Sequence, residues 1–556
     1  MGTQAPRLVG GRHDRGLLDT TPRPSAAVDI RPNEMWAVAI PCTLMRLGVM
    51  PAACQRAVPA DTVVGMTIWT PCLARLMAGA AVVVALAVPA TTAEAGGPLE
   101  TGFLPAESID GSAGAVQLER MRTAGASVVR MFLHWRNVAP EGRERQRPQF
   151  DARDHKDPAY RWEEYDRQVN AIVAAGLKPL VTIHSAPQWA YPADAEINEV
   201  AFRPDTAELG VFARAAARRY SGRVKGLPRV RLWQAWNEPN ISIMLRPQLV
   251  GGRPVSPGLY RAMVNAIADG VKSVHADNVV LAGGTAPFRD NTPEVQAQNK
   301  RWGPLTFMRQ VLCLSRELRP TCKARVRFDV WSHHPYTSGG PTHEAVLPDD
   351  ASLGDLPDVR RVLDAAVRAG HVRSRGKPRF WVTEFSWDSR PPDPNGVPTA
   401  LHTRWVAEAL YRMWLSGVSL VTWFSLRDQP LGTSFLQSGL YYRGATVAKD
   451  RPKPALQAFR FPLVAFVEGS RVRVWGRTPA GKRGRVVVEQ SFRGGWKRLG
   501  VLQSGQNGIF GRVFATGTTG YVRARLASGT ARAAPFSLKN VPDRFFTPFG
   551  AVDLEP

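Results

Sequence analysis

Short apolar runs alternate with amphipathic segments from Gly102 to about Phe461. The runs have the length and the Val, Ile and Phe content of buried strands, and the segments between them repeat their apolar positions at helical spacing. The predicted strands cover residues 102–105, 127–133, 178–184, 230–236, 278–282, 328–332, 380–383 and 419–425. Eight strands that alternate with helices over roughly 360 residues predict an α/β fold of the (β/α)₈ or TIM-barrel type.

The segments between these strands supply the helices of such a barrel, and several of them end at a glycine, a common helix stop. The predicted helices cover residues 116–124, 162–175, 206–220, 258–275, 305–313, 356–369 and 399–415. An open, doubly wound sheet would carry a glycine-rich phosphate turn after its first strand. The sequence has no such turn there, which favours the closed barrel.

The pattern changes after Pro462, where apolar and polar residues alternate with a period of two and glycine-rich turns separate the runs. Such alternation is typical of half-buried strands of an antiparallel sheet. The predicted strands are 471–475, 485–490, 511–514 and 521–526. We therefore expect a barrel domain over residues 96–462, followed by a small all-β, immunoglobulin-like sandwich over 463–556.

The N-terminal region has the features of a targeting segment. Residues 76–88 form an apolar run of 13 residues that follows Arg75, and Ala93-Glu94-Ala95 supplies a small-residue cleavage site. The sequence predicts a signal peptide over residues 66–95 and a secreted or cell-wall-associated protein with no stable membrane span in its mature form. Residues 1–65 are interpreted as a non-native or disordered extension; the alternative is a cytoplasmic tail before an uncleaved anchor.

Cysteine usage fits an exported chain. Three of the five cysteines precede the predicted mature start, which leaves Cys313 and Cys322 nine positions apart. An even pair in an exported protein predicts one local disulfide, and two buried thiols are the alternative. No C-x-x-C motif or Cys/His cluster is present, so no metal site is predicted.

The formal net charge of +25 indicates a basic surface that would attract anionic cell-wall polymer or other acidic polymers. An arginine-rich composition without a functional role is the alternative. No recognition helix, zinc knuckle or RNP-like strand accompanies the charge, so nucleic acid is not an expected partner.

Two glutamates stand where predicted strands end. Glu238 follows strand 230–236 and Glu384 follows strand 380–383. Active sites of (β/α)₈ barrels form at the carboxyl ends of the strands, and glycoside hydrolysis requires two carboxyl groups across the scissile bond. Either glutamate alone could belong to a surface salt bridge, but the pair in this context points to catalysis.

The surrounding motifs resemble clan A of the glycoside hydrolases, nearest to the cellulase-like family 5, with family 39 second. That clan has Asn-Glu-Pro after its fourth strand, matched by Asn237-Glu238-Pro239, and a glutamate that ends its seventh strand, matched by Glu384. Family 5 also carries an arginine, a histidine, a His-x-Tyr and a tryptophan at the ends of other strands. The residues at those places are Arg130, His184, His334-Pro335-Tyr336 and Trp423.

The resemblance implies a role for each residue. Glu384 would be the nucleophile and Glu238 the acid/base, while Asn237 would bond the sugar 2-hydroxyl and Tyr336 would donate to Glu384. Arg130 would lie near Glu384, and His184 and His334 would bond the sugar or tune the carboxyl groups. Either imidazole of the His333-His334 pair could point inward. Trp423 would be a sugar platform, and the candidates for further subsites are Trp135, Trp189 and Trp387. Each histidine or tryptophan could instead be a core residue.

The sequence thus predicts a secreted retaining O-glycosidase that acts on a carbohydrate substrate by double displacement and requires no cofactor. The sugar, pyranoside or furanoside, stays open, as does endo or exo action. Two alternatives are a non-catalytic glycan- or cell-wall-binding protein on the same barrel and a basic protein whose binding to acidic polymers is independent of sugar.

Overall fold

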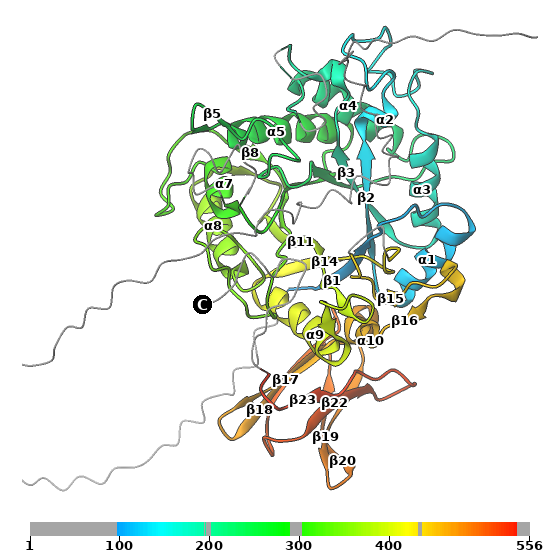
Figure 1. Ribbon diagram of the computed structural model, residues 1–556, viewed down its shortest axis with the longest axis vertical. Helices are drawn as coiled ribbons and strands as arrows, with labels where there is room; N and C mark the ends of the chain where they lie inside the picture. The colour runs from blue at the N-terminus through cyan, green and yellow to red at the C-terminus, as the bar shows by residue number, and fades with distance from the viewer. Residues whose placement is uncertain (1–96, 194, 196–201, 290–302, 432–435, 542–556) are drawn as a thin grey trace, which may run out of the picture. The chain divides into compact units, whose positions relative to one another are not determined.

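The computed structural model describes residues 97–541, apart from 194, 196–201, 290–302 and 432–435 (Figure 1). The predicted signal peptide and the extension before it lie outside the described residues. Among the helices that are described, none combines the length and the apolar character needed to cross a membrane.

Eight parallel strands close into a barrel in the order β1-β14-β11-β9-β7-β4-β3-β2 (Figure 1). This observation confirms the (β/α)₈ prediction, and every strand overlaps its predicted range. The strands are β1 Glu100–Leu104, β2 Val128–His134, β3 Lys178–His184, β4 Leu232–Ala235, β7 Val279–Thr285, β9 Val330–His333, β11 Arg379–Phe385 and β14 Val418–Phe424.

Seven of the described helices that follow the strands overlap the predicted ranges, and α10 Pro454–Arg460 was not predicted. The seven are α1 Gly111–Thr123, α3 Glu163–Ala174, α4 Thr206–Arg219, α5 Ser256–Val274, α7 Pro304–Val311, α8 Leu356–Arg368 and α9 Thr399–Leu415. In α8 the buried positions Leu356, Val359, Val362, Leu363 and Ala366 recur at helical spacing, which is why the pattern identified it.

Helix α1 begins at Gly111, five residues before the predicted start at Val116. Its first turns consist of glycine, serine and alanine, which carry no large apolar side chain and so give no periodic signal. The turn is close-packed: a Cβ at Gly114 would lie 2.0 Å from the backbone of Ile109. Val116, the first residue of the predicted range, is 37% exposed.

The barrel interior contains an apolar layer and a polar layer. The apolar layer consists of Val128, Leu180, Leu281, Val330, Trp381 and Leu420. Side chains two residues apart on a strand point to the same face, so Arg130, Thr182 and Ser332 stand above that layer, toward the carboxyl ends of the strands. All three are completely buried. Buried polar groups need hydrogen-bond partners: Ser332 donates to the carbonyl oxygen of Ala282, and Arg130 donates to Thr182 and to residues of the candidate active site.

The region after the barrel is all-β. One antiparallel sheet contains β17 Leu463–Glu468, β18 Arg471–Arg477 and β21 Ile509–Ala515. The other has the order β20-β19-β22-β23, with bounds Gly495–Gln503, Arg485–Phe492, Tyr521–Leu526 and Phe536–Ser537. All four predicted strands are present; β20 was missed because most of its residues are exposed and its apolar residues do not alternate regularly with polar ones. Whether the two sheets form an immunoglobulin-like sandwich stays a prediction.

The predicted disulfide is confirmed. Cys313 and Cys322 are bonded, and their Cα atoms lie 5.2 Å apart. The bond closes the loop that follows α7.

Candidate active site at the carboxyl ends of the strands

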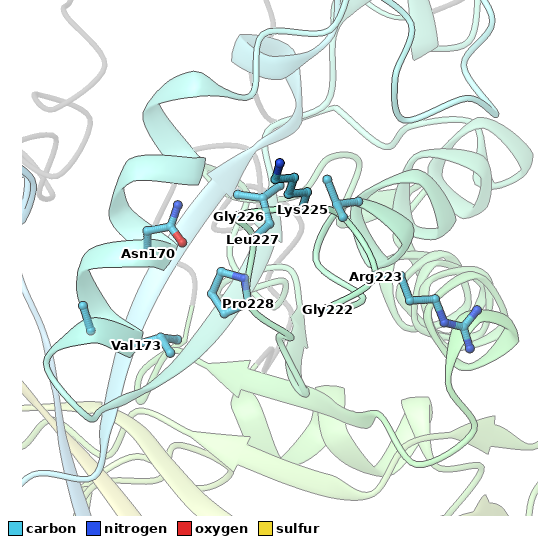
Figure 2. A pocket seen from close by; sticks show the side chains of 10 residues that line it. Asn170, Val173, Gly222, Arg223, Lys225, Gly226, Leu227 and Pro228 are labelled. Atoms are coloured by element: carbon cyan, nitrogen blue, oxygen red, sulfur yellow. The ribbon is translucent and has the colours of Figure 1, made fainter.

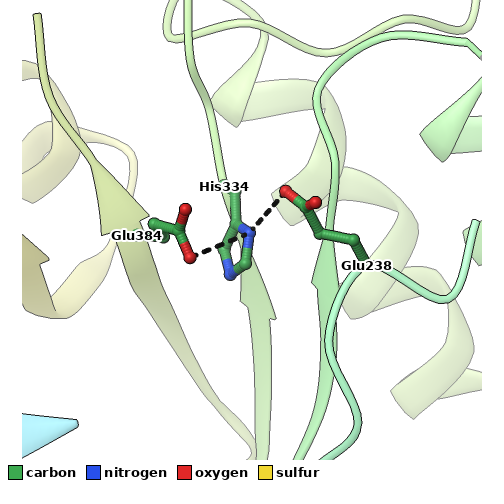
Figure 3. Close-up of side chains that lie close together, drawn as sticks. All are labelled: Glu238, His334 and Glu384. Carbon is green, nitrogen blue, oxygen red and sulfur yellow. Dashed lines mark hydrogen bonds and ion pairs between the residues drawn. The ribbon is translucent and has the colours of Figure 1, made fainter. Parts of the chain in front are cut away.

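The two predicted catalytic glutamates face each other at the carboxyl ends of β4 and β11. Glu238 lies three residues beyond the end of β4, and Glu384 is the penultimate residue of β11. One oxygen of each carboxyl group and one nitrogen of His334 all lie within 4.8 Å of one another (Figure 3). Figure 3 shows the imidazole between the two carboxyl groups. The sequence placed these residues on separate strands, and the closure of the barrel brings them together.

Arg130 positions several side chains of the site through hydrogen bonds made from the interior of the barrel. Its guanidinium, 0% exposed, donates to Glu384 Oε2 at 3.0 Å and to the carbonyl oxygen of Thr383 at 2.9 Å. The same group donates to Asn237 Oδ1 at 2.6 Å and to Thr182 Oγ1 at 3.1 Å. A planar guanidinium presents donors in fixed directions, so one buried cation fixes the orientation of both Glu384 and Asn237.

Glu384 accepts hydrogen bonds on both of its carboxyl oxygens. Besides the contact with Arg130, its Oε1 accepts a hydrogen bond from the hydroxyl group of Tyr336 at 2.9 Å. Burial raises the pKa of Tyr336 well above its ordinary value, so its hydroxyl group stays protonated and remains a donor. The two donors fix the orientation of the Glu384 carboxyl group, which a nucleophile requires.

Glu238 has the opposite environment. Burial raises its pKa to about 7, and the more distant Arg130 offsets only part of that shift. A carboxyl group with this pKa holds its proton in mildly acidic solution, which suits a general acid. The two glutamates therefore differ in their partners: Arg130 and Tyr336 donate to Glu384, and His334 contacts Glu238.

His334 links the two carboxyl groups as a neutral imidazole, because burial lowers its pKa to about 3. Its Nε2 lies 3.5 Å from Arg130 Nη1, and since a guanidinium can only donate, Nε2 acts as the acceptor. The proton of the neutral ring then resides on Nδ1, which lies 3.0 Å from Glu238 Oε1. With Oε1 accepting from the imidazole, the acidic proton of Glu238 belongs on Oε2.

The structure decides which histidine of the pair faces the site. His333 Nδ1 lies 2.7 Å from Thr285 Oγ1, and its Nε2 lies 2.7 Å from the carbonyl oxygen of Ala351. These contacts are structural and lie outside the catalytic cluster. Successive side chains of a strand point to opposite faces, so His334 is the inward one.

Asn237 keeps one donor for a ligand. Its Oδ1 accepts from Arg130, while its buried Nδ2 has no hydrogen-bond partner. A buried amide without a partner is unfavourable unless a ligand completes it. The placement fits the sugar-hydroxyl contact that the resemblance implied.

The backbone around Glu238 is strained. Trp236 and Glu238 have φ angles of 66° and 43°, a region that residues other than glycine rarely adopt. The turn is fixed by the Glu238 N–H, which donates to the carbonyl oxygen of Gly284 at 2.8 Å. A Cβ at Gly284 would lie 2.6 Å from Gln234 Nε2, so only glycine fits there. Strain of this kind, about 1–3 kcal/mol per residue, is common at functional sites.

His184 reaches the same region from the end of β3. Its Nδ1 lies 2.7 Å from Ser185 Oγ, its ring packs on Trp236 at a centroid distance of 4.7 Å, and its buried Nε2 has no partner. Burial lowers the pKa of His184 well below its ordinary value, so it is neutral. The free nitrogen suits a hydrogen bond with a sugar hydroxyl, as predicted.

Trp423 differs from the prediction. It is 0% exposed, donates to the carbonyl oxygen of Ser438 at 2.9 Å and packs against Phe385 and Phe459. Leu420 belongs to the interior layer, so strand alternation turns Trp423 toward the helices and Phe424 toward the barrel interior. The expected sugar platform at Trp423 is therefore corrected to a core role, and Phe424 takes the inward position.

The other three tryptophans are also core residues rather than exposed platforms. Trp135 and Trp189 pack edge to face at 5.7 Å, and Trp387 packs against Trp405. Their exposed fractions are 1%, 8% and 1%. The indole N–H groups of Trp189 and Trp387 donate to backbone carbonyl oxygens. Their positions after strand ends were a weak signal, because large aromatic residues fill the wall of the barrel as well.

Two threonines of the site were not predicted from the sequence. Thr182 accepts from Arg130, and Thr383 Oγ1 lies 3.2 Å from His334 Nε2. Both are polar residues within apolar strands: Thr383 lies one residue before Glu384, and Thr182 lies two residues before the end of β3. An isolated polar residue in a buried strand was the signal that could have identified them.

The same three groups, Glu238, His334 and Glu384, offer the donor atoms that a metal ion would use. Arg130 places a buried positive charge against Glu384 Oε2, one of the oxygens in question. That charge disfavours a divalent cation at the same atom. The arrangement fits acid/base chemistry better than metal ligation.

A hollow of about 580 Å³ lies elsewhere, between the end of α3 and the loop that joins α4 to β4 (Figure 2). Its lining includes Asn170, Val173, Arg223, Lys225 and Pro228. Segments that precede a strand belong to the amino-terminal end of the barrel, which is associated with stability rather than catalysis. The carboxyl groups lie at the other end.

No family model matches the chain, and no curated protein matches it. Among solved structures, a family 39 glycoside hydrolase from Bacteroides cellulosilyticus WH2 is 16% identical, covers 75% of this chain and 79% of its own, and has a TM-score of 0.44. A monomeric beta-xylosidase from Caulobacter crescentus CB15 is 14% identical, covers 75% and 94%, and has the same TM-score. A family 1 β-glucosidase from Thermotoga maritima is 14% identical, covers 62% and 84%, and has a TM-score of 0.39.

These names are those of glycoside hydrolases, and they include family 39, the second of the two families that the motifs resemble. Because the identities do not exceed 16% and the TM-scores lie below 0.5, the function of this chain is inferred from the geometry of its site.

Proposed function

We propose that this protein is an exported retaining glycoside hydrolase with Glu238 as acid/base and Glu384 as nucleophile. The observation that carries the proposal is the pairing of the two glutamates. Burial raises the pKa of Glu238 to about 7, and one of its oxygens lies within 4.8 Å of an oxygen of Glu384. Arg130 and Tyr336 hold the Glu384 carboxyl group. Retaining enzymes have carboxyl groups about 5–5.5 Å apart, whereas inverting enzymes need about 6.5–9.5 Å to admit water. The short separation supports retention.

The reaction would proceed in two displacements. Glu384 attacks the anomeric carbon while Glu238 gives its proton to the departing glycosidic oxygen, so the C–O bond to the leaving group breaks as the ester to Glu384 forms. Glu238, now ionised, takes a proton from water, whose oxygen attacks the anomeric carbon and releases Glu384. The unpaired Nδ2 of Asn237 would donate to the sugar 2-hydroxyl and stabilise both transition states.

Secretion and the substrate are parts of the same proposal. The apolar run and cleavage motif before Gly96 support export. Solved structures of this fold include proteins named as xylosidases and glucosidases, so xylosides and glucosides are the first substrates to test.

The decisive experiment assays aryl glycosides, pyranosides and furanosides together, with the wild-type protein, Glu384→Gly and Glu238→Ala. Glu100→Gln, at the opposite end of the barrel, is the matched control. We expect Glu384→Gly to lose activity by about 10³-fold or more. Added azide should then yield a glycosyl azide of inverted configuration from Glu384→Gly and of retained configuration from Glu238→Ala.

The stereochemistry of the first product, followed by NMR, completes the test. Retained anomeric configuration supports the proposal, and an inverted first product contradicts it. A folded protein that cleaves neither aryl glycosides nor polysaccharides would favour the glycan-binding alternative.

A further inference from the structure

The all-β region after the barrel is strongly cationic. Residues 463–540 contain 14 lysines and arginines but only two acidic residues, a net charge of +12. This is about half of the chain's formal charge of +25 in about one seventh of its length. Charge gathered in this way creates a field that attracts polyanions.

The sheet β20-β19-β22-β23 has one buried face and one outward face. Val486, Val488, Val522 and Ala524 belong to the hydrophobic core, so the alternate residues of β19 and β22 point outward. The register pairs Ser491 with Trp496 and Glu489 with both Arg498 and Arg523. We call this surface the outer sheet face; its residues are Val487, Glu489, Ser491, Trp496, Arg498, Val501, Tyr521, Arg523 and Arg525.

Two aromatic side chains lie in one row of the outer sheet face. Trp496 on β20 and Tyr521 on β22 are 37% and 50% exposed, and Ser491 of β19 stands between them. The Tyr521 N–H donates to Ser491 Oγ at 2.8 Å, which fixes that side of the row. Two strand spacings place the aromatic residues about 10 Å apart, a span that a disaccharide unit of an extended chain can cover.

The next row supplies oriented arginines. Glu489 accepts from Arg523 Nε at 2.9 Å and lies 3.6 Å from Arg525 Nε. The Arg523 guanidinium lies over the Trp496 ring, 4.0 Å from its centroid, and so supports the indole from one side. Arg498 stands opposite Glu489 in the register. Arg498, Glu489 and Arg523 form this row, and Arg525 lies one row further on, opposite Val487. Three arginines and one carboxylate leave these two rows with excess positive charge beside the aromatic pair.

We propose that the outer sheet face binds an extended acidic polysaccharide, with sugar rings on Trp496 and Tyr521 and sugar carboxylates at the arginines. Aromatic rings pack against the apolar C–H faces of sugars, and a guanidinium pairs with a carboxylate through two parallel hydrogen bonds. The two features lie in adjacent rows of a rigid sheet, as a polymer with alternating apolar faces and carboxylates requires.

The choice of a glycan over a single-stranded nucleic acid, which also uses aromatic and arginine contacts, rests on the proposed function of the barrel. The outer sheet face would keep the enzyme on its polymer while the barrel cleaves. Binding is measured without turnover, so the test of this surface stands whether or not the barrel cleaves any particular glycoside.

The experiment measures Kd at fixed ionic strength for polygalacturonate and for its fully methyl-esterified form, which has the same backbone without the charge. The whole protein is used, with Glu384→Gln to prevent turnover. Trp496→Ala and Tyr521→Ala should each weaken binding to polygalacturonate by about five- to tenfold. Phe492→Ala is the matched control, because Phe492 is 55% exposed on the same hairpin but belongs to the opposite alternation of β19.

The contribution of the arginines is measured in the same binding assay. Arg523→Gln combined with Arg525→Gln should weaken polygalacturonate binding and flatten its salt dependence, whereas Arg512→Gln, exposed on the other sheet, should not. Loss of affinity on esterification supports the proposal. Equal or tighter binding of an oligothymidylate of the same charge, or unchanged Kd in Trp496→Ala and Tyr521→Ala, would overturn it in favour of general polyanion attraction.

Discussion

His334 Nδ1 lies 3.0 Å from Oε1 of Glu238. Arg130 faces Nε2, the other ring nitrogen, so the proton of the neutral imidazole resides on Nδ1 and is donated to Glu238. The acidic proton of Glu238 therefore belongs on Oε2. The acid/base therefore depends on a chain of contacts from three different strands. Each link in that chain leads to a testable consequence.

The pKa of about 7 for Glu238 sets the alkaline limb of the activity profile. The general acid must be protonated for the first displacement, so kcat/KM should fall as the pH rises through about 7. A pH–rate profile with an aryl glycoside whose leaving group needs protonation measures this. With an activated leaving group the limb should be weaker, since departure then needs less help from the acid. A limb that is identical for both leaving groups would assign the titration to another group.

The same pKa has a consequence for stability. The folded-state pKa of Glu238 is raised above its unfolded value of about 4.5, so its favourable contribution is complete below that value and is lost as the pH rises through about 7. Glu238→Gln removes the titration. The variant should gain stability relative to the wild type between pH 5 and pH 8, by up to about 3 kcal/mol. Chemical denaturation at both pH values measures this, and Glu100→Gln should show no such trend.

Arg130→Lys tests whether the several donors of the guanidinium group position the site. Three separate nitrogens of Arg130 donate to Thr182, Glu384 and Asn237, whereas the donors of a lysine all lie on one nitrogen. A lysine therefore cannot reach all three acceptors, and both the nucleophile and the amide lose orientation. We expect a decrease of about 10²-fold in kcat/KM with the charge preserved. Circular dichroism checks that the variant folds. Activity within a factor of about two of the wild type would contradict the positioning role.

Asn237→Ala tests the unpaired amide donor. If Nδ2 bonds the sugar 2-hydroxyl, the variant and a 2-deoxy substrate remove the same interaction. Each change alone should lower kcat/KM by about 10²-fold, and the combination should cost little more than one change. Additive losses would mean that Asn237 and the 2-hydroxyl act independently.

Substitution of Trp423 should affect stability, whereas substitution of Phe424 should affect substrate binding. Trp423→Phe removes a hydrogen bond and buried volume from the layer under α10, so the free energy of unfolding should fall by about 1–3 kcal/mol with KM unchanged. Phe424→Ala should raise KM, because Phe424 takes the inward position at the end of β14. The opposite pattern would restore Trp423 as the sugar platform.

A buried ion pair supports the loop after β14. The side chains of Lys453 and Asp428 are each 1% exposed and lie 2.6 Å apart. Lys453→Met would leave Asp428 buried without its cation, so the free energy of unfolding should fall by about 3–5 kcal/mol. Arg361→Gln breaks an exposed pair with Asp358 and should change stability by less than about 1 kcal/mol.

The sequence by itself determined the barrel and the identity of its two carboxyl groups. Apolar runs of strand length and helical periodicity are local properties, so all eight strands and helices such as α8 could be predicted, and Glu238 and Glu384 were visible because each interrupts or follows an apolar run. The Cys313–Cys322 bond could likewise be predicted, because only two cysteines follow the predicted mature start.

Only the tertiary structure decided the geometry of the site. Which imidazole of the His333–His334 pair faces inward, and which ring of Trp423-Phe424 does so, depends on strand register, because a shift of one residue turns a side chain to the other face. The hydrogen-bond partners of Arg130 come from β3, β11 and the segments after β4 and β9, so no local pattern could reveal them. The pKa of Glu238 arises from burial among those strands, which exists only once the barrel has closed.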